Sequence, residues 1–241
     1  MYYEDGFSII TCNCRFSCIV NLITNFITQE FPNKELILII NNDDINIDDF
    51  NIYTDIFKNI NVFKLPQSTN LGVCLNFAVS KCRYKYIAKF DDDDFYSKYY
   101  LSEMYDAFIN TNSDFVGKWQ YYIYLEGSNK LLARPNVSIN IRQNRYLKWL
   151  PGATICFKKE VFDKIEFSDV NKHVDDDIMK KANDENMSIY TTTIYNFMAF
   201  RHMDINEHTW QITHEKLEES CMVVNDNISF EDAKKYIMKK F

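Results

Sequence analysis

The sequence predicts an α/β fold with a mostly parallel central sheet flanked by helices and a small antiparallel extension. Two observations support this prediction. In the first ninety residues or so, short apolar segments alternate three times with segments of helical spacing, which is typical of doubly wound sheets. Polar residues also directly follow two of the apolar segments, and the ligands of such sheets bind beyond the carboxyl ends of the strands.

The first half is expected to alternate strictly between strands and helices. Segment 35–40 (ELILII) is apolar without interruption, as in a parallel strand that is buried on both faces. In segment 15–28, Ile19, Leu22 and Phe26 share one helical face. The expected strands are 7–12, 35–40, 62–65 and 86–90, and the expected helices are 15–28, 48–58 and 73–82.

The second half has weaker patterns. Segments 114–119 and 121–125 are strand-like, and a turn leads from the latter into 130–133, so we expect a hairpin that extends the sheet. Segment Arg134–Trp149 has no clear period and is expected to be a mobile loop. Residues 215–241 are expected to form one or two amphipathic helices, because apolar residues recur there at helical spacing.

Length and composition indicate one domain that spans residues 1–241. Hydrophobic residues make up 46% of the chain and aromatic residues 16%, which is enough for a sizeable core. The formal net charge of -7 argues against a nucleic-acid partner, which needs a basic surface. The seven cysteines are scattered and odd in number. They therefore predict buried free thiols in a reducing cytosol rather than a zinc site.

We expect a cytoplasmic protein, because the sequence shows no signal peptide and no apolar run as long as a membrane span. The C-terminal segment combines Lys234, Lys235, Lys239 and Lys240 with apolar residues. Such a segment could contact an anionic membrane surface, which would make the protein peripheral at the inner membrane face. A solvated helix face is the more ordinary explanation.

The most informative stretch is the run of four carboxylates, Asp91–Asp94, at the end of the expected strand 86–90. Adjacent like charges at the end of a buried strand need a positive partner, and carboxylates favour a hard divalent cation. A solvated acidic turn is the alternative. The first strand is followed by neither the glycine pattern G-x-G-x-x-G nor a P-loop. A metal would therefore replace the missing backbone cradle for phosphate.

In order and spacing, six segments resemble the family 2 type of GT-A glycosyltransferases, which use nucleotide-diphosphate sugars. These segments are SIITCN, ELILIINND, NLGVCLNFAVSKC, YIAKFDDDD, WLPGATICFKKEVF and VDDDIMKKANDENMSIY, and they cover roughly residues 7–200. The resemblance implies a nucleotide-sugar half (about 1–100), an acceptor half (about 101–214) and a helical tail (215–241). It also implies a Mn²⁺ or Mg²⁺ cofactor and a UDP-sugar as the first choice of donor. The acceptor would be a glycan, a lipid-linked sugar or a protein.

The resemblance assigns roles to individual residues. For the metal it implies Asp93, together with Asp91, and His208 at the end of the recognisable part. Positions that match the nucleotide-sugar site are occupied by Thr11, Asn41, Asn42, Asp43, Asn70, Gly72, Asn76, Lys89, Asp91, Asp92, Gly152 and Ala153. Asn41 and Asn42 replace the usual Asp pair, and Leu75 stands where a basic residue is frequent.

The resemblance places the general base in the acidic segment after 170. It implies Asp175, with Asp176 as the alternative if the register shifts by one, and Val174 replaces the usual Glu. A carboxylate can accept the proton of an acceptor hydroxyl as its oxygen attacks the anomeric carbon, which inverts that carbon. Ordinary helix capping also explains acidic residues at a helix start.

Two other functions stay open from the sequence. A nucleotidyltransferase would also use carboxylates and a metal, but the Gly/Lys/Arg-rich phosphate signature that it should carry near the N-terminus is missing. A binding module that keeps the fold without turnover is compatible with the departures at Asn41, Asn42 and Val174.

Overall fold

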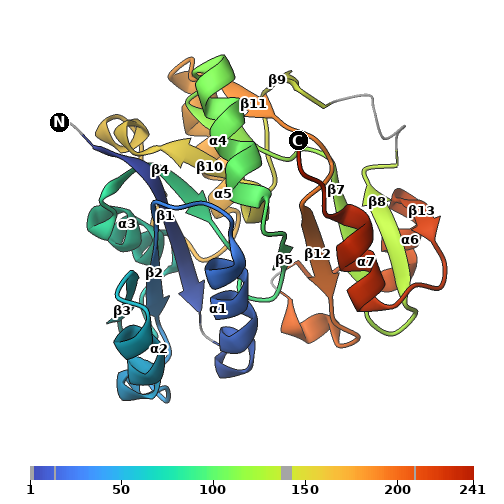
Figure 1. Cartoon of the computed structure of the whole chain (residues 1–241), viewed down its shortest axis with the longest axis horizontal. Coiled ribbons are helices and arrows are strands. Elements are labelled where there is room, and N and C mark those ends of the chain that lie inside the picture. Colours follow the sequence, from blue (N-terminus) through green and yellow to red (C-terminus); the bar gives the residue numbers. More distant parts are fainter. Residues whose placement is uncertain (1–2, 14, 137–142, 209) are drawn as a thin grey trace.

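The structure is a computed structural model that describes residues 3–13, 15–136, 143–208 and 210–241. A mostly parallel sheet forms its centre (Figure 1). The strands of this sheet are β1 (Glu4–Asn13), β2 (Lys34–Ile40), β3 (Ile60–Lys64), β4 (Tyr84–Lys89), β6 (Phe115–Gly117), β9 (Arg145–Leu147), β10 (Cys156–Lys158) and β11 (Ile189–Thr191). Their order is β3-β2-β1-β4-β10-β6-β11-β9. Pairs among β1 to β4 are parallel, and β10 is antiparallel to β4 and β6.

Helices cover both faces of this sheet. On one face lie α1 (Ile19–Thr28), α2 (Asn51–Ile56) and α4 (Tyr100–Thr111), and on the other lie α3 (Leu71–Lys81) and α5 (Val174–Asp184). The apolar stripe of α1, with Ile19, Leu22 and Phe26, is buried against the sheet. Strand β2 is buried at nearly every position, as its uninterrupted apolar sequence predicts. The predicted α/β class with a mostly parallel sheet is confirmed.

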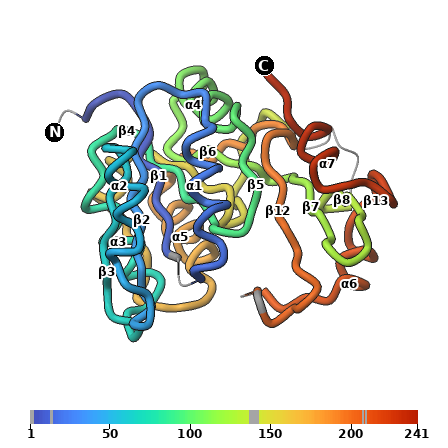
Figure 2. Tube along the Cα trace, turned by 60° about the horizontal axis from the view of Figure 1, so that its bottom comes forward, coloured from blue at the N-terminus to red at the C-terminus, as the bar shows by residue number. Residues whose placement is uncertain are grey.

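A second sheet stands beside the first (Figures 1 and 2). Its strands are β5 (Phe95–Tyr96), β7 (Tyr121–Leu125), β8 (Lys130–Arg134), β12 (Phe197–Arg201) and β13 (Met222–Asn225), in the order β13-β8-β7-β12-β5. Helix α7 (Phe230–Ile237) packs on one face and α6 (His214–Ser220) on the other. Strand β5 directly follows the acidic run, so the second sheet begins at the edge of the candidate site.

Three expectations need correction. The hairpin β7–β8 forms as predicted, but it pairs with β12 in the second sheet instead of extending the first. The C-terminal tail contains β13 between its two helices. Segment Arg134–Trp149 contains β9, which pairs with β11 at the edge of the sheet. The side chains of β9 are largely exposed, so no period marks this strand in the sequence. Residues 137–142 of the expected loop lie outside the described residues.

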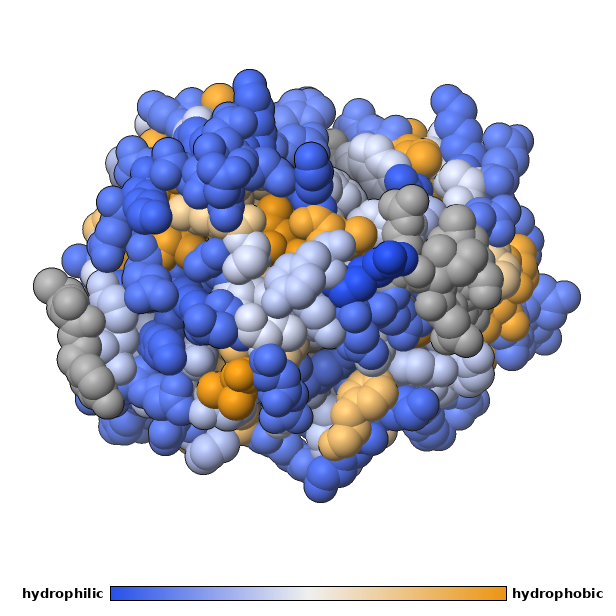
Figure 3. All heavy atoms as spheres, turned by 90° about the horizontal axis from the view of Figure 1, so that it is seen from above, coloured by the Kyte–Doolittle hydropathy of each residue, from blue (hydrophilic) through white to orange (hydrophobic). Residues whose placement is uncertain are grey.

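The surface is mixed in character. The face shown in Figure 3 is largely hydrophilic, and its apolar side chains form small groups. Among the residues that the structure describes, no helix combines the length and apolarity that crossing a bilayer requires. The cysteines of the described part are free, and Cys74, Cys82, Cys156 and Cys221 are buried, as the sequence predicts.

Candidate functional site

The acidic run lies at the carboxyl end of β4, next to the end of β1. The Thr11 hydroxyl donates to the Phe90 carbonyl at 2.9 Å, which ties the two strand ends together. On α1, the Asn21 amide donates to the carbonyls of Asp92 and Asp94 at 2.8 and 2.9 Å. The side chains of Thr11 and Asn21 therefore hold the turn through its backbone carbonyls, and these contacts leave its carboxylates available for other partners.

Two basic side chains neutralise the acidic run. The Arg15 guanidinium pairs with Asp92 and also lies 3.2 Å from Oδ2 of Asp93. The Lys89 ammonium pairs with Asp91. Burial lowers the pKa of Lys89, but Asp91 outweighs this effect and the net pKa is raised. Sequence reasoning found Lys89 and missed Arg15. The one sequence signal for Arg15 is its position just after the first strand, at the edge of the sheet where ligands are expected to bind.

Two members of the acidic run, Asp92 and Asp94, are buried. Burial raises the pKa of Asp92 above its ordinary value, although Arg15 opposes the effect. Burial and the neighbouring carboxylates raise the pKa of Asp94 strongly. One Asp94 oxygen accepts the backbone N–H of Phe200 at 3.0 Å, which connects the turn to β12 of the second sheet. Asp91 is the member whose carboxylate is most open to solvent, with 38% of its side chain exposed.

The loop at Gly152 joins the acidic run to Asp175. The Gly152 N–H donates to Oδ2 of Asp175 at 3.1 Å. A Cβ at Gly152 would lie 3.0 Å from both Cβ and Oδ2 of this aspartate, so glycine allows the close approach. The Tyr96 hydroxyl accepts the Asp91 N–H at 2.9 Å and donates to the Ala153 carbonyl at 2.6 Å. Four predicted site residues, Asp91, Gly152, Ala153 and Asp175, are thus linked through these contacts.

Asp175 and Asp176 differ in their surroundings. Asp175 is partly buried behind the loop, and its charge contributes to the raised pKa of Lys89. The side chain of Asp176 is 57% exposed and accepts a hydrogen bond from the Trp149 indole at 2.9 Å. Both residues lie in the first turn of α5. Asp175 therefore accepts its hydrogen bond from Gly152 itself, whereas Asp176 is held by Trp149.

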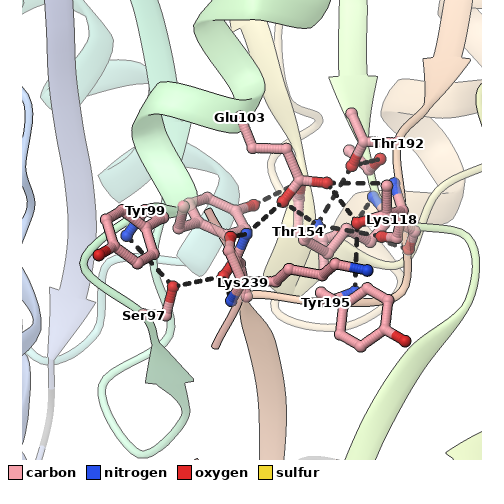
Figure 4. Close-up of polar contacts among 12 residues, drawn as sticks. Ser97, Tyr99, Glu103, Lys118, Thr154, Thr192, Tyr195 and Lys239 are labelled. Atoms are coloured by element: carbon pink, nitrogen blue, oxygen red, sulfur yellow. Dashed lines mark hydrogen bonds and ion pairs between the residues drawn. The ribbon is translucent and has the colours of Figure 1, made fainter. Parts of the chain in front are cut away.

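A buried polar network surrounds Glu103 and Lys118 and includes Thr154, which ends the 3-10 turn that begins at Gly152 (Figure 4). The Lys118 ammonium, fully buried after β6, donates to Oε2 of Glu103 at 2.8 Å. Its backbone N–H donates to the Thr154 hydroxyl at 3.1 Å. Glu103 also accepts hydrogen bonds from Thr193 and Asn196, which lead into β12. The network therefore connects the loop, α4 and the second sheet.

His208 lies close to the acidic run. Its Nδ1 is 3.7 Å from Oδ2 of Asp93, and its Nε2 accepts the His202 N–H at 2.9 Å. Burial, followed by the positive charge of Arg201, lowers the pKa of His208 to about 4, so the imidazole is neutral near pH 7. Because Nε2 is the acceptor, the proton of the neutral ring sits on Nδ1. Nδ1 therefore offers no lone pair to a metal in this arrangement.

Other predicted residues have structural partners. The Asn76 amide exchanges hydrogen bonds of 2.8 and 3.0 Å with the backbone of Phe167. At Gly72 a Cβ would lie 1.8 Å from the Ser168 carbonyl oxygen, and Asn70 donates to Asp169 at 2.9 Å. These three residues therefore hold segment 167–169 against α3. In the described part of the chain, none of the three is hydrogen-bonded to the acidic run.

The residues that follow β2 lie on the same edge of the sheet but one strand further along. Asn41 is half-buried at the end of β2. Asn42 accepts the Asp44 N–H at 2.9 Å, and Asp43 accepts the Gln67 N–H at 3.2 Å. Because β1 separates β2 from β4, these residues flank the acidic run rather than join it.

A divalent cation fits part of the predicted ligand set. Among the described residues, no three His, Cys, Asp or Glu side chains converge to hold a metal. Asp91 and Asp93 nevertheless offer the carboxylate oxygens that Mg²⁺ and Mn²⁺ prefer. Mg²⁺ in particular is usually held by one or two carboxylates together with substrate phosphates. These two aspartates fit such a shared site, whereas His208 does not fit in its present tautomer.

The arrangement of sheets and helices is that of the GT-A fold. In comparisons with solved structures, it matches residues 1–349 of S. aureus TarS with a TM-score of 0.65 and 17% identity, covering 81% of this chain and 60% of that one. The complex of the same TarS fragment with UDP-GlcNAc matches with a TM-score of 0.64 and 18% identity, covering 81% and 58%.

The family model of glycosyl transferase family 2 matches residues 7–165, and the chain belongs to this family. A curated relative, the O-antigen biosynthesis glycosyltransferase WbnJ of Escherichia coli, is 29% identical over an alignment that covers 66% of this chain. The chain spans 64% of the length of that relative.

Proposed function

We propose that this protein transfers a sugar from a nucleotide-diphosphate sugar to an acceptor hydroxyl and inverts the anomeric carbon. Membership of glycosyl transferase family 2 supports the class of reaction. A TarS fragment with the same fold has been solved with UDP-GlcNAc, which supports a UDP-sugar as the first donor to test. The observation that carries the proposal is the link from the acidic run through Ala153 and Gly152 to Asp175.

In this proposal Asp175 is the general base. Its carboxylate can accept the proton of the acceptor hydroxyl while that oxygen attacks the sugar. The Gly152 N–H holds Oδ2 of Asp175 and leaves Oδ1 for the acceptor. Asp176 is a poorer candidate because it is exposed and already holds the Trp149 indole.

Lys89 and Arg15, the basic residues at the acidic run, can stabilise the negative charge of the departing nucleoside diphosphate. A nucleoside diphosphate gains negative charge as the glycosidic bond breaks, and a cation held by Asp91 and Asp93 would supply compensating charge there. Lys89 lies at the same place and keeps its proton near neutral pH, because the carboxylates around it raise its pKa. Arg15 can exchange its contacts with Asp92 and Asp93 for diphosphate oxygens, since guanidinium binds both kinds of oxyanion.

Release of nucleoside diphosphate from a panel of sugar donors, with Mn²⁺ or Mg²⁺ and mixed acceptors, tests the proposal. We expect release with at least one UDP-sugar. The variant Asp175→Asn should lose turnover at least about a hundredfold while it keeps its affinity for UDP.

The matched control is Asp176→Asn, which removes the neighbouring carboxylate and should keep most of the turnover. The proposal for the base fails if Asp176→Asn abolishes turnover and Asp175→Asn does not. If the wild type binds UDP but turns over no donor, the chain is a nucleotide-sugar-binding module instead.

A further inference from the structure

The second sheet carries two arginines at the ends of its strands. Arg134 ends β8 and Arg201 ends β12, on opposite sides of β7. Neither forms an ion pair with a carboxylate in the part of the chain that the structure describes. Nε of Arg201 and Nη1 of Arg134 are buried and have no hydrogen-bond acceptor there. Burying a guanidinium N–H without an acceptor costs free energy of folding. A bound ligand that accepts these hydrogen bonds would remove that cost.

Both guanidinium groups converge on one indole. The Trp210 ring centre lies 4.4 Å from Cζ of Arg134 and 5.5 Å from Cζ of Arg201. Arg201 is only 7% exposed, and its Nη2 donates to the Trp210 carbonyl at 2.7 Å. Trp210 itself is 45% exposed, so it forms the boundary between the arginine pair and solvent. Two cations that share one ring repel each other unless an anion lies between them.

The positive charge of Arg201 is incompletely balanced. Burial lowers its pKa, and although the more distant Asp94 and Asp93 act in the opposite direction, the net pKa stays below its ordinary value. The same burial raises the pKa of Tyr121, which lies opposite Arg134 in the β7–β8 ladder, to about 12. The phenol is therefore neutral near pH 7 and does not supply the missing negative charge.

The arginine pair lies on the side of the second sheet that faces the candidate site. Tyr121 and Ala199 on this side pack against the core cluster that contains Phe90 and Tyr96, and Ala153 packs against the same cluster. Arg201 follows Phe200, whose N–H binds Asp94 of the acidic run. A ligand between Arg134 and Arg201 would therefore lie beside the acidic run, toward the second sheet.

We propose that Arg134, Arg201 and Trp210 form a binding site for a phosphate group. The fork of a guanidinium donates two parallel hydrogen bonds to phosphate oxygens, and the two arginines together supply the charge. This inference rests on the proposed function, because the phosphate belongs either to the acceptor or to the donor diphosphate. In the proposed function Lys89 and Arg15 already serve the donor diphosphate, which favours a phosphate of the acceptor at this second cationic pair.

Calorimetric titration with inorganic phosphate tests the site, first alone and then with UDP at saturation. We expect the wild type to bind phosphate in both titrations, which assigns the site to an acceptor phosphate. Arg134→Gln and Arg201→Gln should each weaken phosphate binding about tenfold, as expected for one lost charge-assisted contact. The matched control is Arg83→Gln, which removes an arginine that already pairs with Glu35 and should bind phosphate like the wild type.

If UDP displaces phosphate and the two variants also lose affinity for UDP, the site is supported but holds the donor diphosphate. The inference is overturned if the wild type binds no phosphate, or if both variants bind it unchanged. It is also overturned if the variants only lower the unfolding midpoint, since packing against Trp210 would then explain the pair. Absence of UDP release from every donor would refute the proposed function, but it would not change the result of the phosphate titration, which needs no turnover.

Discussion

Tyr96 offers the sharpest test of how the site is assembled. Its ring is fully buried and stacks on Phe90 with centroids 3.7 Å apart, and its hydroxyl bridges Asp91 and Ala153. The variant Tyr96→Phe keeps the stacked ring and removes only the two hydrogen bonds. At about 1 to 1.5 kcal/mol for each bond, the free energy of unfolding should fall by about 2 to 3 kcal/mol. The turn and the Gly152 loop would also lose their direct connection.

Tyr100→Phe is the matched control. Tyr100 is as deeply buried, and its hydroxyl donates to the Thr154 carbonyl at 3.0 Å without touching the acidic run. We expect a loss of about 1 kcal/mol in urea unfolding and an unchanged affinity for UDP. Tyr96→Phe should weaken UDP binding about five- to tenfold, measured by calorimetry with Mn²⁺. Equal stability and equal UDP affinity of the two variants would refute the bridging role of Tyr96.

Three further predictions each concern a single residue. Gly152→Ala places a Cβ 3.0 Å from the Asp175 carboxylate and should lower kcat at least about tenfold by displacing the base; an unchanged kcat contradicts this. Glu103→Gln leaves the fully buried charge of Lys118 unpaired and should cost about 3 to 5 kcal/mol in urea unfolding, so a loss below about 1 kcal/mol would count against it. Burial raises the pKa of Cys156 from 9.0 to about 12. The stability that the buried neutral thiol contributes is therefore complete below about pH 9 and is lost as the pH rises toward 12. Equal free energies of unfolding at about pH 8 and about pH 10.5 would contradict this prediction.

Several features of the fold could be predicted from the sequence because they depend on local pattern. The uninterrupted apolar run of β2 predicts a strand that is buried on both faces, and the helical spacing of apolar residues in α1 predicts a helix with one buried face. Parallel strands place their carboxyl ends on one edge of a sheet, and in the structure the end of β1 and the start of the acidic run lie together there. The second sheet was not predicted as separate, since its strands β5 and β13 are short and their sequences carry no clear alternation.

The alternation of strands and helices in the first half, the acidic run and the expectation of a cation beside it come from the sequence alone. These depend on neighbours in the chain and on the chemistry of each residue type. Which basic side chains pair with the acidic run and which aspartate meets Gly152 were decided by the tertiary structure. Arg15 reaches Asp92 across 77 positions, and Gly152 reaches Asp175 across 23. Such contacts depend on how elements pack, and no spacing in the sequence encodes the direction in which a side chain points.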